Sequence, residues 1–418
     1  MTPRLSVALV DDLDRRLAPV DAELARRYPG DRSARQPVHT VYVPADRVTP
    51  DTATQWGAAA RSAMLRHVPS PASLAELCGL AERHADEVYE RVAGKLSREP
   101  VEDLRVDLED GYGRRDDMEE DRHLMQAARA LAEQAGPGAG VPFCGVWVKS
   151  FEHETRRRGI RTLDLFLGAV LAEGPLPRGF VVTLPKVSRV EQVQILVDLC
   201  AALEESYGLA ADTLQFELQI ETPQAVCGDD GAATVARMIS ASAGRCSGLH
   251  YGTYDYSASL GVAPAFQSMD HPVADHAKDV MQVAAASTGV WVSDGSTNVL
   301  PVGDAATIHA AWRLHARLVR RSLERGLRQG WDLHAAQLVT RFAATYGFYR
   351  TGMDAAGARL RAYVQRADSG ILDEPATAFA LASYLLRGLD CGAVDPDEVV
   401  TAAGVELGVL RSLARRDG

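Results

Sequence analysis

Short apolar runs alternate with amphipathic stretches along most of this 418-residue chain, and this alternation restricts the fold more than any other feature. Runs such as 39–45 (HTVYVPA) and 180–187 (FVVTLPKV) have the composition of buried strands. The segments between them repeat apolar residues at helical spacing. This order predicts parallel strands joined by crossover helices. The expected strands are 39–45, 103–109, 143–149, 180–187, 215–221, 248–256, 289–295 and 331–334.

Eight such units over roughly 310 residues predict an α/β fold of the (β/α)₈ type, a TIM barrel. An open doubly wound sheet is the alternative, but no glycine-rich phosphate loop follows an early strand. We expect an N-terminal helical arm over 1–36, a barrel over 37–350 and a small helical C-terminal domain over 351–418. Residues 46–102 are too long for one crossover helix, and they predict two helices separated by PSPAS.

Composition excludes several classes of partner. The net charge of −11 argues against nucleic acid or an anionic membrane surface as the main partner. No apolar run has the length of a membrane span, and the N-terminus has no signal-peptide core. The six cysteines are scattered without a CxxC pair, which is typical of reduced thiols. We therefore expect a cytoplasmic protein with small-molecule partners.

Ionisable residues lie at or just after the C-terminal ends of the expected strands. In a (β/α)₈ barrel these ends form the mouth where chemistry takes place. The strand starts, such as QPVHT and GVPF, are poor in acids, so the asymmetry favours a site over solvated turns. The residues at the strand ends are Asp107, Glu109, Asp110, Lys149, Lys186, Glu221, Asp255, Asp294 and His334.

The segment 216–226 (FELQIETPQAV) alternates apolar and polar residues as a strand does, and then stops at Glu221. Thr222 and Pro223 end the strand, so Glu221 is expected at the mouth. Asp255 ends the next strand, so the two carboxylates are expected to share an ion. Oxygen ligands favour Mg²⁺ or Mn²⁺ over zinc. Such an ion binds a 2-oxo acid and stabilises an enolate as a Lewis acid.

Six motifs in order resemble those of the citrate lyase β-subunit/HpcH-HpaI aldolase superfamily, which includes malyl-CoA lyases and is related to malate synthases. The resemblance covers about residues 38–345, with Ala335 where proline is usual. RGIRTLDLF and LDEPATA resemble a less characterised actinobacterial branch labelled only as aldolase-like. The six motifs are VYVPADR, VDLEDGYG, LPKVSRVEQV, QIETPQAV, GTYDYSASLG and GWDLHAAQL.

This resemblance implies a Mg²⁺-dependent carbon–carbon lyase or synthase that forms a homo-oligomer. Glu221 and Asp255 match the family's metal ligands, and Asp107 and Glu109 match acids that line the metal pocket. The segment LDEPAT (372–377) resembles the malate synthase segment that carries the catalytic base. The candidate bases are therefore Glu374 and Asp373, although the same segment also reads as the start of a helix.

One position departs from the family pattern. The third strand reads VWVKS, with Trp147 where the family's arginine holds the carboxylate of the oxo acid. Lys149 remains, but an ammonium is a point charge rather than a fork. Trp147 can stack on a flatter or more apolar substrate, and the run RRRG (156–159) is either a solvated loop or a site for the phosphates of a CoA thioester. The candidate substrate-binding residues are Trp147, Lys149, Arg161, Lys186 and Thr222.

The sequence thus predicts a Mg²⁺- or Mn²⁺-dependent aldolase or lyase. It would act through an enolate on a 2-oxo acid or acyl-CoA-type substrate. Two alternatives stay open: phosphoryl transfer of the phosphoenolpyruvate type, and a barrel that binds a small acid without turnover. The residues also have structural explanations, because Glu221 and Asp255 can cap helices, Asp107 and Glu109 can pair with cations in the barrel, and Lys186 can be a solvated strand end.

Overall fold

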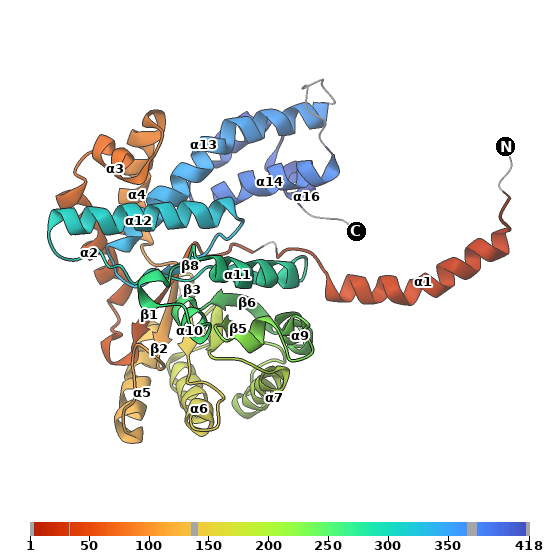
Figure 1. Cartoon of the computed structure of the whole chain (residues 1–418), viewed down its shortest axis with the longest axis horizontal. Helices are drawn as coiled ribbons and strands as arrows, with labels where there is room; N and C mark the ends of the chain where they lie inside the picture. The colour runs from red at the N-terminus through yellow and green to blue at the C-terminus, as the bar shows by residue number, and fades with distance from the viewer. Residues whose placement is uncertain (1–3, 33, 135–140, 366–373, 415–418) are drawn as a thin grey trace.

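The computed structural model describes residues 4–32, 34–134, 141–365 and 374–414. The strands are β1 (His39–Pro44), β2 (Asp103–Asp107), β3 (Phe143–Trp147), β4 (Phe180–Leu184), β5 (Gln215–Ile220), β6 (Cys246–Tyr251), β7 (Trp291–Ser293) and β8 (Gly330–Asp332). They form one parallel sheet in the order β7-β6-β5-β4-β3-β2-β1-β8. A parallel bridge between Ser293 and Gln329 closes it into a barrel. The predicted (β/α)₈ fold is therefore confirmed (Figure 1).

Helices surround this barrel and connect its strands. No helix among the described residues combines the length and apolarity needed to cross a lipid bilayer. Those that precede or connect the strands are α1 (Val7–Arg27), α2 (Thr52–His67), α3 (Pro71–Cys78), α4 (Ala85–Arg98), α5 (Asp117–Gln134), α6 (Arg156–Glu173), α7 (Val190–Tyr207), α8 (Pro223–Val226), α9 (Thr234–Ala241), α10 (Thr253–Ser259), α11 (Pro272–Ala285) and α12 (Ala305–Glu324). After the last strand come α13 (Gln337–Gln365), α14 (Pro375–Asp390), α15 (Pro396–Ala403) and α16 (Leu407–Leu413).

Two local expectations were wrong, each because of a glycine. Between β1 and β2 the chain forms three helices instead of two, since Gly79 adopts a left-handed conformation with φ of 65° and ends α3. This conformation has little cost only for glycine. The sixth strand ends at Tyr251 rather than at residue 256, because Gly252 caps a new helix. Asp255 therefore lies in the first turn of α10 and not at the end of a strand.

Paired charges occupy the middle of the barrel. Arg105 on β2 is 1% exposed, and its guanidinium lies 2.8 Å from Asp103 and 3.0 Å from Glu217. His250 Nε2 lies 3.1 Å from the same Glu217 carboxylate. Burial opposes ionisation of Glu217, but Arg105 and His250 outweigh it and hold its pKa at about 2. The interior is thus a network of compensated charge rather than the usual layers of branched apolar residues.

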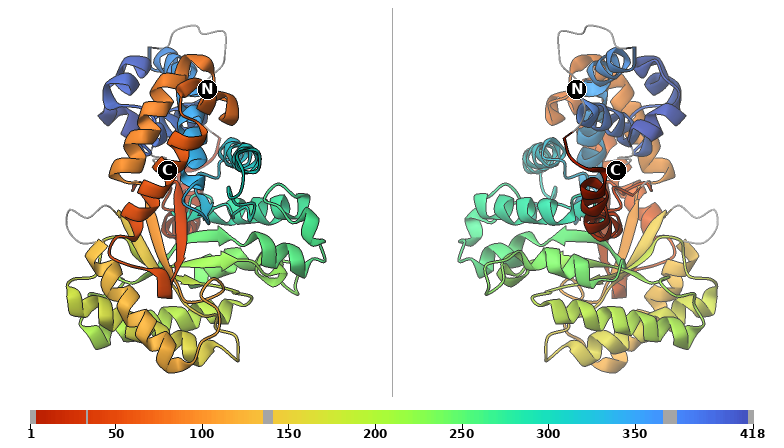
Figure 2. Two further views of the ribbon diagram at one scale, coloured as in Figure 1. Left: turned by 90° about the vertical axis from the view of Figure 1, so that its left-hand side faces the viewer. Right: turned by 90° about the vertical axis from the view of Figure 1, so that its right-hand side faces the viewer.

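The C-terminal helices lie at the end of the barrel where the strands begin. α13 follows β8, and the ring of its Phe342 contacts the ring of His39 at the start of β1. The helix then continues beyond the barrel. Arg387 on α14 pairs with Asp31, in the segment before β1, at 3.2 Å. Figure 2 shows these helices, in blue, stacked on the barrel. They share a small apolar core of their own, which includes Leu360, Ala378, Ala382, Leu385, Val399 and Leu410.

The close approach of β3 to β4 gives the first testable prediction. A Cβ on Gly145 would lie 1.9 Å from the Val181 carbonyl oxygen and 2.5 Å from the Arg105 guanidinium. We expect Gly145→Ala to lower the free energy of unfolding by about 3 kcal/mol or more, because the backbone must shift. Gly408→Ala is the control, since no described atom beyond its chain neighbours and the backbone of its own helix lies within 4 Å of that Cβ. Urea unfolding measures both, and equal stability of the two variants would contradict the packing.

Candidate active site

Three carboxylates surround the Lys186 ammonium at the mouth of the barrel, and a fourth accepts the backbone N–H of the same lysine. Lys186 follows β4, and its backbone N–H donates to Glu221 Oε1 at 2.8 Å. Its side-chain Nζ lies 3.1 Å from Glu109 Oε1, 2.9 Å from Asp110 Oδ2 and 3.6 Å from Asp255 Oδ2. Lys186 has a φ of 52°, an unusual conformation for a residue with a side chain. The backbone is therefore bent where it delivers this cation to the acids.

Glu221 is the most buried member of this cluster. It follows β5 directly and is 2% exposed. Gly252 leaves room for it, because a Cβ there would lie 2.6 Å from Glu221 Oε2. Thr222 is the N-cap of α8, where its hydroxyl accepts from the Ala225 N–H and donates to the Val187 carbonyl at 2.8 Å. Thr222 thus ends the strand and fixes the position of Glu221, rather than offering its hydroxyl to a substrate.

The buried carboxylate and the ammonium determine each other's protonation. Burial raises the pKa of Glu221 well above its usual range, and Asp255 adds to this effect while Lys186 opposes it. Burial alone would lower the pKa of Lys186, but the carboxylates of Glu221, Asp110 and Glu109 outweigh it and raise that pKa. Lys186 is therefore held as an ammonium.

Asp107 lies next to Glu109 and holds its backbone in place. Asp107 Oδ1 accepts the Glu109 backbone N–H at 2.7 Å, and burial raises the pKa of Asp107 to about 6. Burial, together with a hydrogen bond to Asp110, raises the pKa of Glu109 to about 8, against the effect of Lys186. The Oε2 atom of Glu109 is buried without a hydrogen-bond partner. Glu109 is thus an acid that exchanges its proton near neutral pH.

Two of the cations expected to bind substrate are engaged elsewhere. Lys149 Nζ donates to the Leu108 carbonyl at 2.6 Å and lies 3.1 Å from Glu120 Oε2. Arg161 lies on α6, where its guanidinium pairs with Asp121 on α5 at 2.6 Å, outside the mouth. Neither side chain joins the carboxylate cluster.

Trp147 belongs to an aromatic layer inside the barrel, level with Asp107. Its ring packs edge-on against Tyr42 with the centroids 4.7 Å apart, and Tyr42 contacts Trp331 at the same distance. His250 Nδ1 accepts the indole N–H of Trp331 at 3.0 Å. The indole nitrogen of Trp147 is buried without a hydrogen-bond partner, so it is a neutral donor that the protein leaves unused.

The proposed C-terminal base lies far from this cluster within the same chain. Glu374 is an exposed residue at the N-cap of α14. Thr377, one turn further, lines the same hollow as Arg359 of α13. A helix rises about 1.5 Å per residue, so Arg359 lies roughly 30 Å along α13 from Gln337, near the mouth. The chain does not bring Glu374 to its own mouth, and Asp373 lies outside the described residues.

Two further strand-end residues have structural roles. Asp294 is buried outside the sheet, where it lies 3.1 Å from Lys278 and accepts the Ser322 hydroxyl at 2.6 Å. His334 Nδ1 accepts the Ala336 N–H at 3.2 Å, and burial lowers the pKa of its imidazole. Neither joins the carboxylate cluster.

The carboxylates at the mouth offer the oxygen ligands that a hard divalent cation prefers. Glu221, Asp255 and Glu109 offer only oxygen, and one oxygen of Glu109 lacks a partner. Within the described ranges, no group of three His, Cys, Asp or Glu side chains is already arranged to coordinate a metal ion. The Lys186 ammonium stands between the carboxylates instead. A divalent cation can replace that charge only if the ammonium moves aside.

Sequence reasoning missed the partners within the barrel. The role of Asp110, and the layer of Tyr42, Trp331 and His250, were not expected. A signal was present for the charged layer, because DLRVD (103–107) places polar residues at every second position of a strand. That alternation, also present in FELQIE, marks side chains that point into the barrel.

Comparisons with known proteins agree with the fold. Residues 17–417 match the model of a protein family described as a domain of unknown function, DUF6986. A search of curated proteins finds no match. A citrate lyase from Burkholderia xenovorans LB400 is 22% identical with a TM-score of 0.56, and the match covers 76% of this chain and 92% of that one. This similarity shows a shared fold.

A malate synthase from Haloferax volcanii, in a magnesium/glyoxylate complex, also matches. It is 14% identical, and the match covers 93% of this chain and all of that one. The TM-score of 0.48 is too low to support an argument from this likeness.

The raised pKa of Glu109 predicts how stability depends on pH in the presence of a chelator. Between about pH 4.5 and pH 8 the folded chain keeps a proton that the unfolded chain has released. The free energy of unfolding should therefore fall as the pH rises through this window, by on the order of 2 kcal/mol. Glu109→Gln should reduce this slope without abolishing it, because the raised pKa values of Asp107 and Glu221 also contribute. Glu76→Gln, at an exposed position on α3, should leave the slope unchanged. Thermal unfolding from pH 5 to 9 tests this, and parallel curves for all three proteins would contradict it.

Proposed function

We propose that this chain, which belongs to the DUF6986 family, is a Mg²⁺- or Mn²⁺-dependent carbon–carbon lyase or aldolase. It would act through an enolate on a 2-oxo acid or acyl-CoA-type substrate, and would run as a synthase in the reverse direction. The observation that carries the proposal is the convergence of four carboxylates on Lys186 at the carboxyl-terminal mouth of the barrel. Glu109, Asp110 and Asp255 lie around its ammonium, and Glu221 accepts its backbone N–H. This mouth is where (β/α)₈ enzymes hold their active sites.

Glu221 and Asp255 are the residues that would hold the metal. When bound, Mg²⁺ supplies a Lewis acid for the keto and carboxylate oxygens of the substrate. A buried carboxylate such as Glu221 gains most from a divalent partner, because its charge is otherwise poorly solvated. Asp255, which is 46% exposed, reaches the same place from the first turn of α10.

Glu109 is the group in this chain best suited to move the proton. Its pKa of about 8 lies near physiological pH, where a general acid or base is most effective. Its free Oε2 can take a proton from the substrate and return it. Asp107 positions Glu109 by accepting its backbone N–H.

The protonation of Lys186 argues against an imine mechanism. A Schiff base requires a neutral amine, and lysines that form one have a lowered pKa. The surrounding carboxylates raise the pKa of Lys186 instead. This favours enolate chemistry at a metal over covalent chemistry at the lysine.

A second candidate is a barrel that binds a small acid without turnover. It is favoured because the Lys149 ammonium, near the mouth, is already paired with Glu120 and bonded to the Leu108 carbonyl. The remaining free donor on β3 is the neutral indole N–H of Trp147. A substrate with a second carboxylate would find no arginine fork there.

Metal binding is the first test of the proposal. We expect Mg²⁺ or Mn²⁺ to bind the purified chain with about 1:1 stoichiometry in calorimetric titration. Glu221→Gln and Asp255→Asn should each weaken binding at least about tenfold, since each removes a charged ligand. Glu76→Gln serves as the control. Undiminished binding in both site variants would refute this assignment.

Turnover is the second test. Pyruvate, oxaloacetate, glyoxylate and acetyl-CoA, alone and in pairs, form the substrate panel. We expect one combination to react with Mg²⁺ present and to stop with EDTA, without release of phosphate. Activity that survives the chelator would refute the metal-dependent mechanism. Binding of an acid without any turnover would favour the second candidate.

Removing the ammonium tests whether Lys186 balances the carboxylates. Lys186→Met should lower the free energy of unfolding by about 2 kcal/mol in EDTA, because the acids then repel one another. Added Mg²⁺ should restore that stability by binding the folded state. Lys186→Arg keeps the charge and is the matched control. If Mg²⁺ stabilises the methionine variant no more than the wild type, the ammonium and the ion do not share a site.

A further inference from the structure

Helix α1 exposes an apolar stripe that contacts nothing in its own chain. Its 21 residues include no buried one. Six of its apolar residues recur at helical spacing, and each is 43–55% exposed. A helix of this length, with Pro19 inside it, is only marginally stable unless it packs against something. The stripe consists of Leu9, Val10, Leu13, Leu17, Val20 and Leu24.

The base of α1 is fixed, and this sets the direction in which the helix leaves the molecule. Gly30 N–H donates to the Ser287 carbonyl at 2.9 Å. Asp31 pairs with Arg387, and the Arg32 guanidinium lies over the Trp291 ring. From this anchor α1 extends away from the rest of the chain, as Figure 1 shows. Its stripe therefore faces outward.

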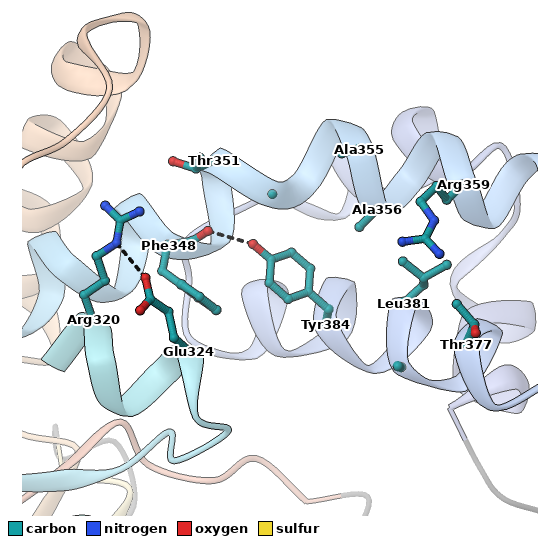
Figure 3. Close-up of a pocket in the computed structure, with 12 residues that line it drawn as sticks. Arg320, Glu324, Phe348, Thr351, Ala355, Ala356, Arg359, Thr377, Leu381 and Tyr384 are labelled. Atoms are coloured by element: carbon teal, nitrogen blue, oxygen red, sulfur yellow. Dashed lines mark hydrogen bonds and ion pairs between the residues drawn. The ribbon is translucent and has the colours of Figure 1, made fainter. Parts of the chain in front are cut away.

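A second unpartnered apolar surface lies on the same chain, between α12, α13 and α14. It is a hollow of about 490 Å³, shown in Figure 3. Small side chains such as Ala355 and Ala380 leave space between the helices, and Phe348, Leu381 and Tyr384 form its apolar wall. The Tyr384 hydroxyl is already bonded to the Phe348 carbonyl at 2.7 Å, so the wall has no free polar group at that point.

The size of the two surfaces indicates how they are used. The α1 stripe exposes roughly 500 Å² of apolar surface, which is the size of the largest apolar patch on a typical monomer, and such a patch is often functional. One helix in one hollow would still bury less than the ~800 Å² per partner of a stable interface. Reciprocal exchange enlarges the interface, because each partner then contributes both a helix and a hollow.

We infer that α1 of one copy lies in the α12–α13–α14 hollow of a second copy, and that the exchange is reciprocal. This arrangement covers both apolar surfaces with groups that every copy carries. It also closes as a two-fold dimer, because each chain gives and receives the same element. The inference does not rest on the proposed chemistry.

Matched variants on each surface test this inference. Light scattering during gel filtration at tens of micromolar should give the mass of a dimer for the wild type. Leu17→Asp should give a monomer, whereas Ala18→Asp, on the opposite side of α1, should remain dimeric. Ala355→Glu should likewise give a monomer, whereas Ala358→Glu, outside the hollow, should not. The second pair leaves α1 unchanged, so it tests the contact even if Leu17→Asp unfolds the helix.

A monomeric wild type, or equal masses within each pair, would overturn the inference. Circular dichroism of every variant checks that the fold persists.

Cross-linking distinguishes exchange from other contacts. A Leu17→Cys chain and a larger, tagged Leu381→Cys chain are mixed and treated with a flexible bismaleimide, both with the exposed Cys227 changed to serine. The Cys227→Ser parent measures background reaction. We expect a product of mixed size that joins the two kinds of chain. Products that join only Leu17→Cys chains, or an internal link alone when both substitutions are in one chain, would overturn the inference.

Discussion

One lysine, Lys186, holds four carboxylates together at the mouth of the barrel, three through its ammonium and one through its backbone N–H, and the arrangement of the site depends on this balance of charge. Glu221 is almost fully buried, and a buried carboxylate is costly unless a cation compensates it. Lys186 compensates Glu221 through the nearby charge of its ammonium and through the hydrogen bond that its backbone N–H donates. The strained backbone at Lys186 is understandable in this light, because it directs the side chain into the acids.

Charge compensation also stabilises the layers deeper in the barrel. Arg105 compensates Asp103 and Glu217 in the middle of the barrel, and the aromatic layer of Tyr42, Trp147 and Trp331 separates this network from the mouth. The lower charges are almost completely buried, and Asp103 Oδ1 lacks a hydrogen-bond partner there as well. Those at the mouth leave one carboxylate oxygen of Glu109 without a partner. Asp110 and Asp255 at the mouth are about half exposed, whereas the lower charges are not, so the mouth is the place where a ligand can reach the carboxylates.

The sequence was sufficient to predict the barrel, because strand and helix periodicities alternate regularly along it. It also placed Glu221 correctly, since Thr222 and Pro223 end the strand in a way that local chemistry requires. It misplaced the end of the sixth strand, because a glycine that caps a helix looks the same in sequence as one within a strand. It could not show that Lys149 is engaged by Glu120, because that pair depends on how two crossover segments pack. The position of Glu374 depends on the path of α13, which no local pattern fixes.

The central claim is that a divalent cation binds between Glu221 and Asp255 and displaces the Lys186 ammonium from the acids around it. A crystal grown with Mn²⁺ tests it most directly, through the anomalous signal of the metal. We predict a single peak within bonding distance of both carboxylates, with the Lys186 side chain turned away from its present position. A crystal saturated with Mn²⁺ that shows no peak there, with Lys186 still between the acids, would contradict the account.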